Sequence, residues 1–200
     1  MSNAFMIAGR ELRAYFRSPL GWVAASAALF IDGVWFISKA LGDAGAKRLS
    51  ATVLSQFFNG VTGVTMIIGI ALSMRLIAQE QEQGTLVLLK TSPVRDWDVV
   101  LGKFLAVFTM IVIITGLTTY MPALIFVHGK VSVGHILTGY LGVLLLGAAT
   151  CSVGLFASAL AKRQVVAAIV GAVIMGALVL LWLLAKMTEP PVTDFLDALA

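Results

Sequence analysis

The chain has 200 residues, of which 60% are hydrophobic and 12% are charged, and its formal net charge is +4. A soluble globular domain carries roughly 25% charged residues, so this chain has too little polar surface for a water-soluble fold. The composition excludes an ordinary soluble protein and predicts an all-α, polytopic transmembrane helical bundle. The basic residues stand at the ends of hydrophobic runs, as membrane anchors do, which argues against a nucleic-acid partner. Cys151 is the single cysteine, so no internal disulfide is expected.

Residues 3–17 predict an N-terminal amphipathic helix that lies in the membrane interface. Three arginines share one face at helical spacing, where they can reach lipid phosphates: Arg10, Arg13 and Arg17. Apolar side chains supply the rest of the helical wheel: Phe5, Ile7, Ala8, Leu12, Tyr15 and Phe16. Pro19 and Gly21 provide a break before the first span. The alternative is a simple basic flank of that span.

Hydrophobic runs long enough to cross about 30 Å of hydrocarbon predict five spans. We place them at 20–38, 55–74, 104–126, 137–160 and 165–185. Small residues recur every four positions in the last two spans and predict close helix packing: Thr150, Gly154 and Ser158, then Ala168, Ala172 and Gly176. Pro122 is expected to bend the third span because it removes a backbone hydrogen bond.

Asp32 interrupts the first span and makes its predicted free energy of membrane insertion only marginally favourable. Its eight Leu, Ile, Val and Phe residues contribute about −2.4 to −4.8 kcal/mol to insertion, and a central Asp costs about +2.5 to +3.5 kcal/mol. An intramembrane acid can face the protein interior as a functional group. The position of Asp32 past the middle of the span instead favours a carboxylate that reaches headgroup water. A cleaved signal peptide over 1–31 is the alternative, but Trp35 and Phe36 continue the hydrophobic run, which favours an uncleaved helix.

The distribution of Lys and Arg predicts the orientation. With a cytoplasmic N-terminus, nine of these residues fall on the inside and five on the outside. Five spans then leave the C-terminus outside. We expect a multi-pass protein of the bacterial inner membrane.

The segment 75–103 is the longest strongly polar stretch, and the charge rule places it in the cytoplasm. We expect the preceding span to continue as a helix through Glu82 and to end or bend at Gly84. The apolar segment 85–90 is too short to cross the bilayer, so it must pack against another surface. Ser92 as N-cap and Pro93 in the first turn then predict the start of the next helix. Two interpretations of the segment 75–103 remain: a lipid-facing hairpin that only reverses the chain, or a lever that docks a cytoplasmic partner.

Residue patterns for catalysis are missing from the sequence. There is no G-x-x-x-x-G-K-[ST] phosphate loop, since Gly102 and Lys103 are followed by Phe104 and precede a span. His128 and His135 share one predicted outside loop without a carboxylate or cysteine, which argues against a metal site. We therefore expect no enzyme activity, cofactor or metal in this chain.

Two parts of the sequence resemble a known family. The loop residues that carry the resemblance are Glu80, Glu82, Gly84, Thr85, Leu86, Leu89, Ser92, Pro93, Val94, Gly102 and Lys103. The N-terminal ones are Arg10, Glu11, Leu12, Tyr15, Phe16, Ser18 and Pro19. These strings are similar to type-2 ABC exporter permeases, and most resemble the subgroup of gliding-motility and nitrous-oxide-reductase-associated permeases.

The resemblance implies a permease subunit whose 84–92 segment is the coupling helix seated in a partner ATPase. That partner would bind ATP and Mg²⁺, and a second permease copy or a paralogue would complete the path across the membrane. The family pattern has six spans, so five imply either a truncated chain or a span supplied by a partner. The alternative function is a non-transport anchoring or assembly subunit, and a membrane-embedded enzyme is a weaker third.

Overall fold

The computed structural model describes residues 2–40, 50–84, 95–128 and 133–187, and within these ranges the chain is helical without strands. The helices in chain order are α1 (Ser2–Arg17), α2 (Pro19–Ala40), α3 (Ser50–Ser73), α4 (Ala78–Glu82), α6 (Asp96–Leu117), α7 (Tyr120–His128), α8 (Val133–Leu160) and α9 (Gln164–Met187). Five stretches of these helices are long and apolar enough to cross a membrane. The predicted all-α bundle of five spans is confirmed.

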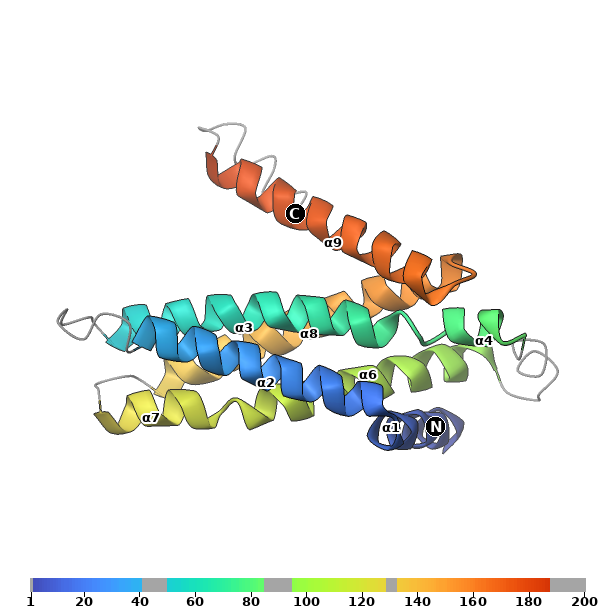
Figure 1. Ribbon diagram of the computed structural model, residues 1–200, viewed down its shortest axis with the longest axis horizontal. Helices are drawn as coiled ribbons and strands as arrows, with labels where there is room; N and C mark the ends of the chain where they lie inside the picture. The colour runs from blue at the N-terminus through green and yellow to red at the C-terminus, as the bar shows by residue number, and fades with distance from the viewer. Residues whose placement is uncertain (1, 41–49, 85–94, 129–132, 188–200) are drawn as a thin grey trace.

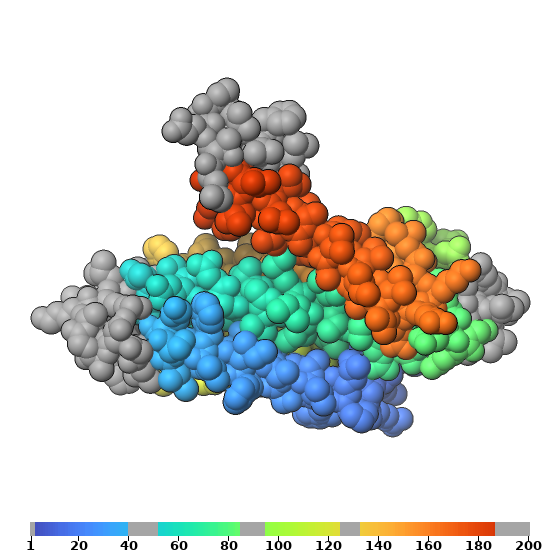
Figure 2. All heavy atoms as spheres, turned by 45° about the horizontal axis from the view of Figure 1, so that its top comes forward, coloured from blue at the N-terminus to red at the C-terminus, as the bar shows by residue number. Residues whose placement is uncertain are grey.

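Four of the spanning helices form a bundle, and two helices leave its axis (Figure 1). Helices α2, α3, α6 and α8 run along the long axis, while α1 lies across one end, beside the start of α6. Helix α9 turns back from α8 and then leaves the bundle at an angle, so its far half stands away from the other spans (Figure 2). Most of its large apolar side chains are exposed, as expected for a helix facing lipid or another subunit.

The bundle core is held by close contacts between small residues. A Cβ atom at Gly154 of α8 would stand 2.5 Å from the Cβ of Ser73 in α3, and one at Gly69 would stand 2.8 Å from Cγ2 of Thr150. The predicted packing stripe of Thr150, Gly154 and Ser158 is therefore confirmed, since all three are buried.

The stripe predicted in the last span is wrong by one residue. Ala172 and Gly176 are exposed, whereas the buried side of α9 carries Ala167, Gly171 and Met175. Both sets recur every four residues, so periodicity alone does not fix which one faces the bundle. In the structure Gly171 faces α3 and α8, where an added Cβ would lie 3.4 Å from Cγ2 of Ile70 and 3.6 Å from Cβ of Ala157.

A sharp corner joins α1 to α2, as the sequence predicts. Ser18 caps α2, because its Oγ accepts a hydrogen bond from the Gly21 amide at 3.4 Å, and Pro19 occupies the first helical position. A side chain at Gly21 would collide with the Tyr15 carbonyl oxygen. The glycine thus lets α1 turn across the end of the bundle.

Two helix boundaries differ from the prediction. The second span does not continue as one helix to Glu82: α3 ends at Ser73, and α4 begins only at Ala78. The helix that leads into the third span begins later than the Ser92–Pro93 signal predicts, because α6 starts at Asp96 with Arg95 at its N-cap. Ser92 itself lies outside the described residues. Asp96 does lie in the first turn, where a carboxylate favours the positive end of the helix dipole.

The third span bends where the sequence predicts a kink. Helix α6 stops at Leu117 and α7 resumes at Tyr120, so both boundaries lie within the five residues before Pro122. A proline at this position removes the amide that would bond to the Thr118 carbonyl, and its ring crowds that carbonyl. The break therefore follows from Pro122, and Thr118 Oγ1 donates to the Thr115 carbonyl at 2.8 Å beside it.

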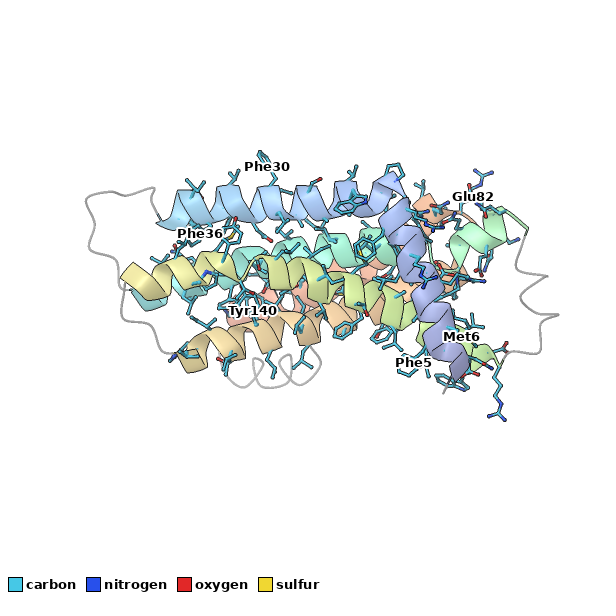
Figure 3. All side chains as sticks on the ribbon, turned by 90° about the horizontal axis from the view of Figure 1, so that it is seen from below. Phe5, Met6, Phe30, Phe36, Glu82 and Tyr140 are labelled. Carbon is cyan, nitrogen blue, oxygen red and sulfur yellow. The ribbon has the colours of Figure 1, made fainter. Side chains whose placement is uncertain are left out.

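The expectation that Asp32 reaches headgroup water is wrong. Its side chain faces α3 and α6 and only 3% of the residue is exposed. Neighbouring positions on α2 carry exposed apolar side chains, including Phe30, which points away from the bundle (Figure 3). Helix α2 is thus rotated so that these apolar side chains face outward and the carboxyl faces inward.

Gly154→Val should separate α3 from α8, because the added side chain has no room beside Ser73. We expect a loss of about 1–3 kcal/mol, typical of overpacking in a filled core. Unfolding of the purified chain in detergent measures it. Gly142→Val on the same helix, where nothing lies within 4 Å of an added Cβ, is the matched control. Equal stability of the two variants would contradict this packing.

Candidate functional site

The polar side chains of the structure gather at the end of the bundle that holds α1, α4, the start of α6 and the turn from α8 to α9 (Figure 3). We call this the basic end. Its described cationic residues are Arg10, Arg13, Arg17, Arg75, Arg95, Lys103, Lys162 and Arg163. The predicted coupling segment begins here, directly after α4.

Lys103 is the centre of the basic end. The lysine side chain is 2% exposed, although it lies only two turns inside α6. Its Nζ is 2.7 Å from Oε1 of Glu80 in α4 and 3.5 Å from Oε1 of Glu11 in α1. A buried ammonium needs compensating charge, and here the two carboxylates come from two other helices. The ion pairs therefore join α1, α4 and α6 at one point.

Gly102 makes this junction possible. A Cβ atom at Gly102 would lie 2.8 Å from the Ala4 carbonyl oxygen and 2.8 Å from Cβ of Ile7. Helices α1 and α6 thus cross with their backbones nearly in contact, which brings Glu11 to Lys103. The adjacent Gly102 and Lys103 act together: one permits the crossing and the other fixes it by charge.

Tyr15 forms the second tie between α1 and the bundle. Its hydroxyl donates a hydrogen bond to the Leu72 carbonyl of α3 at 2.8 Å, and the Arg75 guanidinium lies 6.0 Å from its ring centroid. Burial raises the pKa of the Tyr15 phenol well above its usual value, with Arg75 acting in the opposite direction. The phenol therefore keeps its proton and remains a donor.

A cavity of 240 Å³ lies between these ties. It is lined by Glu11, Ala14, Tyr15, Arg75, Leu76, Gln79, Glu80, Gln83 and Lys103. Its lining combines both signs of charge, and Arg75 Nε donates to Oε1 of Gln79 at 3.0 Å across it. The cavity is a polar gap between α1 and α4 in which the charged side chains have room to rearrange.

Ser158 of α8 explains why α3 and α4 are separate helices. Its Oγ accepts hydrogen bonds from the amides of Ile77 at 3.0 Å and Ala78 at 2.9 Å, and donates to the Met74 carbonyl at 3.0 Å. A continuous helix would pair the Ala78 amide with that same carbonyl. The fully buried hydroxyl replaces this pairing and ties the break to α8.

Helix α4 is also held from its other side. Gln81 Nε2 donates to the Ala159 carbonyl at 3.2 Å, and Gln164 Nε2 of α9 donates to Oε2 of Glu82 at 3.2 Å. Helix α4, which has five residues, is therefore held by α6, α8 and α9. Gly84 ends it with a positive φ of 70°, a conformation that glycine adopts without strain.

The predicted coupling residues are only partly described. Glu80 lies in the ion pair, Glu82 bonds to α9, and Gly84 ends α4 as predicted. The others lie outside the described residues: Thr85, Leu86, Leu89, Ser92 and Pro93. The sequence interpretation missed the roles of Glu11, Lys103 and Ser158. A lysine one position before a hydrophobic run was the available signal, but it was assigned to the membrane anchors.

The three arginines of the predicted interfacial helix do share one side of α1. Arg10, Arg13 and Arg17 line a shallow groove with Phe5 and Met6, and these side chains are exposed. The groove has basic and apolar parts along one helix, a combination that suits the boundary between lipid headgroups and acyl chains. Placement of α1 in the membrane interface stays a prediction.

Comparison with known proteins adds a family match. The family model described as ABC-2 family transporter protein matches residues 5–195. No curated protein and no solved structure matches the chain. The matched range contains most of α1, the five spans and the basic end.

Lys103→Met should destabilise the basic end, because it removes the buried ammonium between Glu80 and Glu11, while the exposed Arg10 guanidinium 3.1 Å from Oε1 of Glu11 remains. Each carboxylate side chain is about one-fifth exposed, so we expect a loss of about 2 kcal/mol, between the values for exposed and buried pairs. Unfolding in detergent measures it. Adding Glu80→Gln to this variant should recover part of the loss, and failure to do so would contradict the pairing.

Ser158→Ala should loosen the α3–α4 break, because two amides and one carbonyl lose their shared partner. We expect a loss of about 1–3 kcal/mol and faster hydrogen exchange at Ile77 and Ala78. Ser152→Ala on the same helix removes only a local bond to the Ala148 carbonyl and is the matched control. Unchanged exchange in Ser158→Ala would show that the hydroxyl does not hold the break.

Proposed function

Because the chain belongs to the ABC-2 transporter family, we propose that it is the membrane-spanning permease subunit of an ATP-driven export system. In this proposal a separate ATPase binds ATP and Mg²⁺, and its motion enters the permease through the 84–92 segment. The chain itself performs no covalent chemistry. The sequence contains no phosphate loop, so nucleotide hydrolysis by that route belongs to the partner.

The observation that carries the proposal is the fixation of α4. This helix directly precedes the coupling segment, and the Lys103–Glu80 pair and the Ser158 hydroxyl bind it to α6 and α8. A push on the coupling segment would therefore act on two spans at once. Such rigid attachment suits a lever, whereas a hairpin that only reversed the chain would need no buried ion pair.

Orientation follows from the basic end. Loops rich in Lys and Arg remain on the cytoplasmic side of membranes. We propose that the basic end, and with it the N-terminus, faces the cytoplasm of a bacterial inner membrane. The ATPase would then meet the 84–92 segment from the same side.

The transport step would be a switch between two arrangements of packed helices. Binding of ATP would draw two ATPase subunits together, move the coupling segments and shift the spans that are attached to α4. A second copy of this chain, or a paralogue, would supply the opposite wall of the path. The exposed apolar side chains along α9, such as Val165, Ile169 and Val173, leave surface for that neighbour or for lipid.

The second candidate function is a non-transport anchor that holds a cytoplasmic protein at the membrane through the same segment. Both functions need the docking surface, and only the exporter needs motion to pass into the spans. ATP-dependent movement of a substrate into inverted vesicles, which the anchor does not predict, distinguishes them.

Replacing Leu86 and Leu89 with Asp should weaken ATPase association roughly tenfold or more, since charge is placed in an apolar contact. Co-purification of the ATPase with the tagged permease measures it. Gln83→Asp introduces charge at an exposed neighbouring position and is the matched control. Undiminished association in the double variant, with the control behaving equally, would remove the 84–92 segment as the docking site.

A further inference from the structure

The buried carboxyl of Asp32 has no part in the coupling site and lies in a different region of the bundle. It belongs to the spanning part of α2. The residue is 3% exposed, and within the described chain no donor bonds to its Oδ1. An unpartnered polar atom buried in a membrane span is costly and therefore marks a functional candidate.

The carboxyl adjoins a small cavity between α2, α3 and α6. The cavity has a volume of about 10 Å³, enough for about one water molecule. Two hydroxyl-bearing residues line it from opposite helices, Thr65 of α3 and Thr115 of α6, and both are buried. The rest of the lining is apolar, so Asp32 and the two threonines form an isolated polar site.

Among the described residues, no cation pairs with the Asp32 carboxyl. Between Ser50 and Ser73, helix α3 carries no titratable side chain, and neither does α6 between Phe104 and Leu117. On α2 itself, Lys39 Nζ lies 5.2 Å from the ring centroid of Trp35. Tyr140 of α8 is within electrostatic reach of Asp32, but it is bonded to Thr118 and is not a cation.

We propose that Asp32 is a proton-binding site inside the membrane, with Thr65 and Thr115 as its hydrogen-bonding neighbours. In the packed bundle the carboxyl holds its proton, because an ionised carboxylate there would lack both a cation and bulk water. Release breaks the carboxyl O–H bond and passes the proton to water, leaving a carboxylate. Water reaches the site when α2 moves away from α3 and α6.

Helix α2 is the helix of this site that faces outward. The helix lies at the edge of the bundle and exposes Trp22, Val23, Phe30 and Val34. Its close contacts with α3 include Gly60, whose missing side chain admits the indole of Trp35. A metal cation fits the site less well, since hard cations take about six oxygen ligands and three of the side chains that line the cavity carry oxygen.

Carbodiimide labelling tests the proposal, because carbodiimides react with protonated carboxyls in apolar surroundings. The full chain in lipid vesicles should acquire one label at Asp32 at neutral pH, with less labelling as the pH rises. Asp32→Asn should abolish this label, whereas Glu82→Gln, at an exposed position, should not. Peptide mass spectrometry locates the adduct.

Infrared spectroscopy supplies the second measurement and covers the case of poor reagent access. The absorption band of a protonated carboxyl should be present at neutral pH in the wild-type chain and absent in Asp32→Asn. A wild-type chain with neither the label nor the band would overturn the proposal. Protection from labelling by Na⁺ at constant pH would also overturn it, in favour of a cation site.

Discussion

The structure depends on one desolvated charge. Lys103 is 2% exposed and satisfies its ammonium with carboxylates from α1 and α4, so three helices must meet wherever this lysine is buried. A buried cation without its partners is strongly unfavourable, whereas with both partners it fixes a geometry that apolar contacts alone would leave free to slide. Gly102 completes the arrangement, because it lets α1 approach α6 closely enough for Glu11 to reach the lysine.

The need to satisfy every backbone group shapes the rest of the bundle. Where α3 breaks, Ser158 takes the orphaned amides of Ile77 and Ala78, and Tyr15 donates to the Leu72 carbonyl. Where Pro122 breaks the third span, the Thr118 hydroxyl supplies a local bond. At each interruption, therefore, a side chain of the protein forms hydrogen bonds with nearby backbone groups, and lipid does not have to. The two breaks lie at opposite ends of the spans, and the one near α4 is attached to a neighbouring helix.

Hydrophobicity alone predicted the five spans, because lipid requires long apolar helices regardless of tertiary contacts. Local chemistry also predicted the corner at Pro19 and the end of α4 at Gly84. The break before α4 was not predictable, since the hydroxyl that causes it comes from Ser158, about 80 residues away. Two features depend on how each helix is rotated about its axis: the direction of the Asp32 side chain and the set of small residues on α9 that faces the bundle. The sequence does not fix this rotation, because the lipid-facing and protein-facing surfaces of such helices are equally apolar. Lys103 stands at the end of a hydrophobic run, and a sequence pattern does not distinguish a membrane anchor there from a buried member of an ion pair.

These contacts define a block of α1, α4 and the start of α6 that should move as one unit when an ATPase acts on the segment after Gly84. Spin labels at Arg13 of α1 and at Gln83, the residue directly after α4, report on this block in a Cys151→Ser background, since both positions are exposed. The account predicts that the distance between the labels stays constant between nucleotide-free and ATP-bound complexes, and that it changes in Lys103→Met. A distance that varies with nucleotide while Lys103 is intact would contradict the account, because α4 would then move independently of α1.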